Sequence, residues 1–182
     1  EVRERAGAPY ALLTTRRAID DAPLPAPGDG SVHLVVPGRV EEIAAALADE
    51  VAEDRIVAFG GGRVIDVAKS VVAVRRRGDV LAVPTTLSAA EMTKLHRRVD
   101  PADPQIRPAI VINDPELSAS QPENELAAST LNALGHAFEA TVTVSANLIS
   151  TLIAHEAARR LAAGWRDLDG GLTDAHRDSL AL

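Results

Sequence analysis

A strand, a run of glycines and a helix follow one another directly between Ile56 and Lys69, and this junction constrains the fold more than any other part of the chain. Ile56–Phe59 is an apolar run typical of a buried strand. After the glycines, apolar residues recur at the spacing of one helix face: Val64, Val67, Ala68, Val71 and Val72. The pattern predicts a βα unit whose turn is formed by Gly60, Gly61 and Gly62.

Two interpretations of this glycine turn are open. Without Cβ atoms the backbone can take positive φ angles and approach a ligand closely. The unpaired N–H groups and the dipole at the start of the helix would then bind an anion, most often a phosphate or pyrophosphate. The alternative is a tight βα turn without a ligand, because a glycine cluster alone is weak evidence for one. Asp66 and Lys69 are expected together on the flank opposite the apolar stripe.

Apolar runs alternate with helical stripes along the first two thirds of the chain. Strands are expected at 11–15, 32–36, 56–59, 80–83 and 109–112, a loop at 20–31, and an amphipathic helix at 40–51. Continuous apolar strands separated by helices are typical of a parallel sheet covered on both faces. We therefore predict a doubly wound α/β domain over residues 1–117. Its ligand would lie beyond the carboxyl ends of the strands, near Gly60–Gly62, Thr85, Thr86 and Asp114.

The pattern becomes purely helical after Pro122. Helices are expected at 123–142 and 148–163, and we predict that residues 118–182 are the first helices of an all-α domain. On the first of these helices, Asn132 and His136 fall on a different side from the apolar residues. The chain starts without Met and stops at Leu182 inside an apolar pattern, so we expect it to be part of a longer protein.

The composition excludes several classes of protein. A net charge of −7 and the lack of a basic, aromatic-rich stripe argue against a nucleic-acid partner. The chain has no cysteine, which excludes disulfides, thiolate catalysis and cysteine-based zinc sites. No apolar run approaches the roughly 20 residues of a membrane-spanning helix, and no signal peptide is recognisable, so a cytoplasmic location without membrane partners is expected. His33, alone in an apolar run, is read as a core or edge histidine rather than a ligand.

Three motifs occur in the order and spacing of one known family. They are Gly60-Gly-Gly-Arg-Val-Ile-Asp-Val-Ala-Lys69, Val83-Pro-Thr-Thr-Leu-Ser-Ala-Ala-Glu-Met-Thr93, and Asn113-Asp-Pro-Glu-Leu117 followed by Thr130-Leu-Asn-Ala-Leu-Gly-His-Ala-Phe-Glu-Ala140. Together they resemble the iron-containing (group III) alcohol dehydrogenases from about residue 10 to the end of the chain. The resemblance implies a dinucleotide-binding domain, a helical domain, and NAD or NADP with a small-molecule substrate in the cleft between them. A homodimer is expected.

The resemblance also implies which residues bind the cofactor: Gly61, Gly62, Arg63, Asp66, Thr85, Thr86 and Ser88. Gly61 and Gly62 fall against the pyrophosphate, and Thr85, Thr86 and Ser88 fall on a second cofactor loop, where hydroxyls can bond the nucleotide. For the threonines, turn capping is the alternative. Asp66 either orients the nicotinamide side or balances Lys69. Arg63 stands where the family usually has Ser, and either contacts a phosphate and favours NADP or extends into water.

The expected metal site departs from the family pattern. Family members that bind divalent iron or zinc usually carry Asp-x-x-x-His on the first helix of the second domain, followed by two later histidines. Here Asn132 occupies the Asp position and His136 is kept, while His155 and His176 lie outside the expected context. An amide is a poorer ligand than a carboxylate for such cations. A bound metal at Asn132 and His136 is therefore doubtful.

Asn132 and the short Pro-Thr-Thr-x-x-x-x-Glu loop look more like the maleylacetate reductase branch. That resemblance implies reduction of maleylacetate, a dicarboxylate, to 3-oxoadipate in aromatic degradation, with His136 as the catalytic residue that polarises the substrate oxygen or relays a proton. Lys94, His96, Arg97 and Arg98 either bind the dianion or form a solvated basic loop. Ala89-Ala90 replaces the small polar residues that usually precede Glu91.

Three other functions are weighed against this one. A metal-dependent alcohol or glycerol-type dehydrogenase would oxidise a small alcohol. A sugar-phosphate cyclase of the dehydroquinate synthase type shares the glycine motif and Pro-Thr-Thr, but normally continues into an Asp-Ser-rich stretch ending in Gly-Gly-Lys, which Ser88–Thr93 lacks. A nucleotide-binding remnant without catalysis would agree with Asn132 and an incomplete second domain.

Overall fold

The computed structural model describes residues 1–7, 9–21, 27–166 and 172–181. In chain order its elements are α1 (Val2–Ala6), β1 (Ala11–Thr14), α2 (Arg16–Asp21), β2 (Val32–Leu34), α3 (Val40–Glu50), β3 (Arg55–Gly60), α4 (Gly62–Arg75), β4 (Asp79–Pro84), the 3₁₀ turn η1 (Ala90–Met92), β5 (Ile110–Val111), α5 (Pro115–Ala119), α6 (Glu123–Val142), α7 (Leu148–Gly164) and α8 (Asp174–Ala181). Residues 22–26 of the predicted loop lie outside the described residues.

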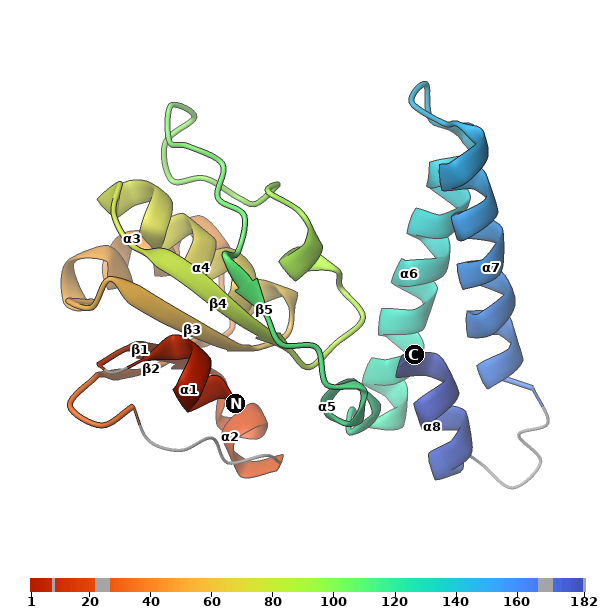
Figure 1. The fold of residues 1–182 in the computed structure, drawn as a ribbon, viewed down its shortest axis with the longest axis horizontal. Coiled ribbons are helices and arrows are strands. Elements are labelled where there is room, and N and C mark those ends of the chain that lie inside the picture. The colour runs from red at the N-terminus through yellow and green to blue at the C-terminus, as the bar shows by residue number, and fades with distance from the viewer. Residues whose placement is uncertain (8, 22–26, 167–171, 182) are drawn as a thin grey trace. The chain divides into compact units, whose positions relative to one another are not determined.

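The strands form one parallel sheet in the order β2-β1-β3-β4-β5 (Figure 1). Leu12 on β1 pairs with Val32 on one side and Val57 on the other, and Phe59 on β3 pairs with Val83. This order reverses between β1 and β3, where ligands of doubly wound sheets bind. The predicted α/β fold with a parallel sheet is confirmed. β2 and β5 are shorter than predicted because they are edge strands, each with one neighbour.

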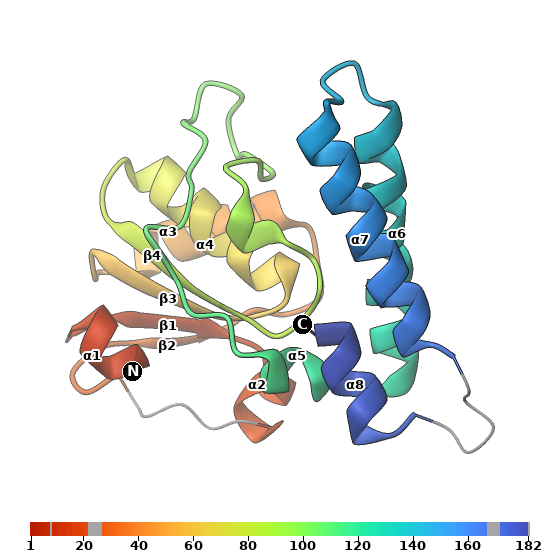
Figure 2. The same cartoon turned by 45° about the vertical axis from the view of Figure 1, so that its right-hand side comes forward.

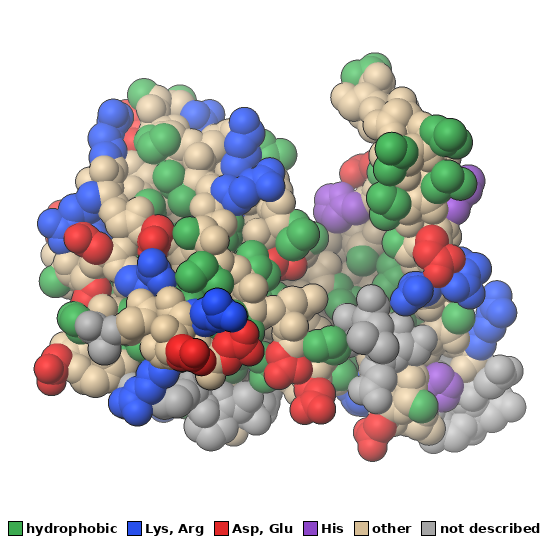
Figure 3. Space-filling view, in the orientation of Figure 1, with side chains coloured by type: hydrophobic (Ala, Val, Ile, Leu, Met, Phe, Trp, Pro, Cys, Tyr) green, Lys and Arg blue, Asp and Glu red, His purple; other side chains and the backbone are tan. Residues whose placement is uncertain are grey.

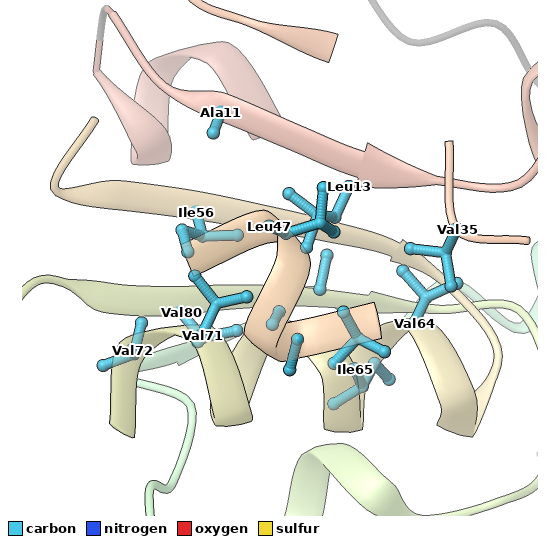
Figure 4. Close-up of a cluster of buried hydrophobic side chains, with 14 of the residues drawn as sticks. Ala11, Leu13, Val35, Leu47, Ile56, Val64, Ile65, Val71, Val72 and Val80 are labelled. Atoms are coloured by element: carbon cyan, nitrogen blue, oxygen red, sulfur yellow. The ribbon is translucent and has the colours of Figure 1, made fainter. Parts of the chain in front are cut away.

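The main hydrophobic core lies between the sheet and the helix pair α3 and α4 (Figure 4). Ile56 and Val80 from the strands meet Val64 and Val71 from α4, and Leu47 comes from α3. Residues of α4 are buried nearly all round the helix, including Lys69 and Ser70. Lys69 shares a flank of α4 with Asp66, as expected, and the segment that follows β4 covers that flank at Lys69.

The chain divides into two compact units, which we describe separately. The first comprises residues 1–85 and 89–114, and the second comprises 86–88 and 115–182. In the second unit, α6 and α7 pack together as an antiparallel hairpin, and α8 contacts α5 and α7 (Figure 2). A capping box at Asn147, whose side chain accepts from the N–H groups of Ile149 and Ser150, starts α7. The predicted helices at 123–142 and 148–163 match α6 and α7 closely.

Large apolar side chains are exposed on the α6–α7 hairpin, mostly toward its connecting end (Figure 3). They are Leu131, Phe138, Val142, Val144, Leu148, Ile149, Leu152 and Ile153. Among the residues that the structure describes, no helix is both long enough and apolar enough to cross a membrane.

Candidate functional site

The glycine turn joins the end of β3 to the start of α4. A Cβ atom on Gly60 would lie 2.7 Å from Cγ2 of Val64, so the close approach of strand and helix requires glycine there. Gly61 is the N-cap of α4 and has a φ of −75°. Of the three glycines for which positive φ angles were expected, Gly60 has one, at 158°, and Gly61 and Gly62 do not. The turn therefore depends on close packing at Gly60 rather than on a left-handed backbone at the next two positions.

The N-terminus of α4 has no side-chain cap. The N–H groups of Val64 and Ile65 donate to the carbonyl of Gly61, at 3.0 and 3.2 Å. The N–H groups that precede them have no acceptor within the helix, as at every helix start. Gly61 and Gly62 are half-buried, whereas Arg63 is exposed. This turn thus presents bare amides to an anion, and Arg63 is free to reach solvent or a phosphate.

Thr85 lies directly beside this turn. Its N–H donates to the carbonyl of Gly60 at 3.1 Å, and its side chain is 5% exposed. Within the described part of the chain, its Oγ1 has no hydrogen-bond partner. Because a buried hydroxyl without a partner is unfavourable, the site favours a ligand that would bond it. Turn capping, the alternative for this threonine, does not account for its hydroxyl.

The bare amides of α4 and the unpaired hydroxyl of Thr85 fit a dinucleotide with a negatively charged pyrophosphate. Thr86 and Ser88 are half-buried and belong to the second unit. There the N–H of Leu87 donates to Oγ of Ser129 at 2.9 Å, an anchor that the sequence did not indicate. The cofactor roles of Thr86 and Ser88 stay predictions.

Asp66 and Lys69 form an ion pair on α4. Lys69 is fully buried, and its Nζ lies 3.1 Å from Oδ1 of Asp66. Burial lowers the pKa of Lys69, and the charge of Asp66 opposes that shift. Of the two roles considered for Asp66, the structure shows the ion pair that balances the charge of Lys69. A contact of Asp66 with the nicotinamide stays a prediction.

Glu91 is a buried carboxylate for which the sequence motifs predicted no role. It is 9% exposed, and its Oε2 has no hydrogen-bond partner among the described residues. Burial raises the pKa of Glu91, while its own backbone amide and the charge of Lys69 lower it. The sequence signal that could have indicated this position is a charged residue between the apolar residues Ala90 and Met92.

In the basic cluster at 94–98, two of the side chains bond backbone groups of the same loop. Nε2 of His96 accepts from the N–H of Ile106 at 3.1 Å, and burial lowers the pKa of the ring. Arg98 donates to the carbonyls of Pro101 and Asp103. His96 and Arg98 thus hold their own loop together. They also line a hollow of about 300 Å³, with Arg97, Pro101 and Glu41, whose carboxylate disfavours an anion.

His136 and Asn132 are both exposed on α6, one turn apart. Nδ1 of His136 lies 3.3 Å from Oε2 of Glu139. Across the described residues, no three or more His, Asp or Glu side chains come together as a metal site. The donors within the described residues are therefore too few to hold a divalent metal by themselves, and metal binding by the protein stays a prediction. The catalytic role of His136 stays a prediction.

Comparison with known proteins gives a consistent result. The family model for iron-containing alcohol dehydrogenase matches residues 31–99. The maleylacetate reductase of Sphingobium indicum is 34% identical over 167 residues, which are 85% of this chain and 47% of that protein. Maleylacetate reductase 1 of Rhodococcus opacus is 36% identical over 146 residues, 77% of this chain and 40% of that protein.

Solved structures agree with the sequences. A putative alcohol dehydrogenase from Ralstonia eutropha JMP134 superposes with a TM-score of 0.76 at 31% identity, covering 98% of this chain and 55% of that one. A maleylacetate reductase from Agrobacterium tumefaciens gives a TM-score of 0.76 at 24% identity, covering 98% and 55%, and supports the fold alone.

The fold, the glycine turn and these matches show that the chain belongs to the iron-containing alcohol dehydrogenase family. Within the family the chain resembles the maleylacetate reductase branch, as the motifs predicted. The chain spans about half the length of the curated relatives that it matches.

Proposed function

We propose that this chain is part of a nicotinamide-dependent reductase that acts on an unsaturated oxo-dicarboxylate, as maleylacetate reductases do. The observation that carries the proposal is the uncapped start of α4 beside the buried, unpaired hydroxyl of Thr85. The identity of 31–36% to several maleylacetate reductases supports the choice of substrate.

In this proposal the main-chain amides of Gly61 and Gly62 would hold the cofactor pyrophosphate, and the Thr85 hydroxyl would bond the nucleotide. When bound, the nicotinamide supplies a hydride to the carbon–carbon double bond of maleylacetate. The second carbon of that bond needs a proton, which we assign to His136 or to a water that it orients. No step is assigned to a metal, because the described donors do not form a metal site.

Turnover measurements test the proposal. Oxidation of NADH and of NADPH is followed with maleylacetate and with small aldehydes, each with and without added iron or zinc. We expect oxidation with maleylacetate that does not depend on the metal. Turnover of aldehydes only when metal is added would instead indicate a metal-dependent alcohol dehydrogenase. Cofactor binding in calorimetry without turnover of any substrate would favour a nucleotide-binding remnant.

A further inference from the structure

Lys69 uses every hydrogen that its ammonium group has. Its Nζ donates to Oδ1 of Asp66 at 3.1 Å, to the carbonyl of Ala90 at 2.9 Å and to the carbonyl of Leu95 at 2.8 Å. An ammonium group has three N–H donors, so none is left for a ligand. One fully buried side chain of α4 thereby joins the helix to both ends of the segment 90–95.

Stability alone is a poor explanation for a cation at this position. Burying an ammonium group is unfavourable, and well-packed apolar side chains often replace buried ion pairs without loss of stability. The acceptors from the segment 90–95 are neutral carbonyls, and Asp66 is the hydrogen-bonded carboxylate. What Lys69 gives that an apolar residue cannot is a defined position for two carbonyls of that segment.

We infer that Lys69 is a positioning residue, which fixes the segment 90–95 against α4 and so holds in place the loop that carries Thr85. This inference rests on the proposed cofactor role of Thr85. The loop is fixed to the first unit at both ends. At one end Thr85 donates to the carbonyl of Gly60, and at the other the carbonyl of Ala90 accepts from Lys69. Losing Lys69 removes the attachment at Ala90, while the N–H of Leu87 still donates to Oγ of Ser129.

The test compares wild-type protein with Lys69→Met, which keeps a long apolar side chain and removes all three donors. Two controls match it. Arg107→Met removes an exposed cation from the same unit, and Leu47→Ala destabilises the core of that unit through α3. If Lys69→Met does not fold, Lys69→Met combined with Glu91→Gln also neutralises the buried carboxylate of Glu91, whose charged form Lys69 stabilises. Each protein is measured by hydrogen exchange, thermal unfolding and NADH titration.

We expect amides between residues 89 and 96 to exchange at least roughly tenfold faster in Lys69→Met, with the amides of β3 and β4 unchanged. The dissociation constant of NADH should rise roughly tenfold in the same variant. Leu47→Ala should lower the melting temperature without raising that constant, which separates positioning from stability. Arg107→Met should resemble wild type in all measurements.

Other outcomes overturn the inference in distinguishable ways. Unchanged exchange in Lys69→Met would show that Lys69 does not hold the segment. Faster exchange with unchanged NADH affinity would show that the segment does not position the cofactor site. If wild type binds neither NADH nor NADPH, the proposed function fails and the role toward the nucleotide fails with it, while the exchange comparison still decides whether Lys69 holds the segment.

Discussion

Gly60 and Val64 are so close that a single added methyl group on the glycine would lie 2.7 Å from Cγ2 of the valine. Val64 is 1% exposed and cannot swing into solvent. We expect Gly60→Ala to lower the free energy of unfolding by about 1–3 kcal/mol, as overpacked core positions do. Urea denaturation followed by circular dichroism measures it.

A matched glycine on α6 gives the opposite expectation. A Cβ atom on Gly135 would meet nothing within 4 Å. Because alanine is the better helix former, Gly135→Ala should raise the free energy of unfolding by about 0.5–1 kcal/mol. If both substitutions had the same effect, close packing at Gly60 would not be the reason for glycine in the turn.

Thr85→Val separates binding from stability. Valine has nearly the same shape and lacks the buried hydroxyl that has no partner in the described structure. Removing this hydroxyl should raise the free energy of unfolding by up to about 1 kcal/mol, while the affinity for NADH falls roughly fivefold to tenfold. Chemical denaturation and calorimetric titration of one preparation measure both quantities. Unchanged affinity would remove Thr85 from the cofactor site.

His96 makes the stability of its loop depend on pH. Since its Nε2 accepts from the N–H of Ile106, protonation would place two donors against each other. Burial lowers the pKa of His96 below the usual 6.5. The neutral ring therefore stabilises the fold fully above that value, and this contribution declines as the pH falls below it, because the unfolded chain binds the proton first.

The measurement is the free energy of unfolding of wild type and of His96→Gln at pH 7.5 and pH 5.5. We expect wild type to lose more stability between the two pH values than His96→Gln does. His136→Gln, at an exposed position on α6, is the control and should follow wild type. An equal loss in wild type and His96→Gln would contradict the assigned hydrogen bond.

Asn132→Asp tests whether the amide at position 132, in place of the family's carboxylate, weakens metal binding at His136. The substitution places a carboxylate one helical turn before His136, the spacing at which two side chains share a face. Because carboxylates bind such cations better than amides do, zinc affinity should rise at least roughly tenfold over wild type. Calorimetric titration with zinc measures it, and adding His136→Ala should abolish the gain.

Much of the sheet and of the hairpin could be predicted, since buried parallel strands and amphipathic helices leave regular patterns. β1, β3 and β4 were found from continuous apolar runs. The short helices α1, α2, α5 and α8 were missed, because five to eight residues carry too little periodicity.

The parts of the candidate site that local sequence motifs encode could be predicted, whereas the parts that depend on tertiary contacts could not. The glycine turn and Thr85 follow from local motifs. The burial of Lys69 and the engagement of His96 with Ile106 follow from how a distant segment covers α4, which no local pattern encodes. Spacing alone placed Lys69 on the flank opposite the apolar stripe, and it did not show that the donors of Lys69 are all satisfied inside the protein.

The strand order has a consequence for how the protein is made. β1 is second in the sheet, and its partners are β2 and β3, so Ala11 pairs with Ile56. A ribosome must therefore synthesise the chain past the glycine turn before its first strand can find its inner neighbour. Until then an apolar segment stays exposed on the nascent chain, a state in which chaperones would be expected to act.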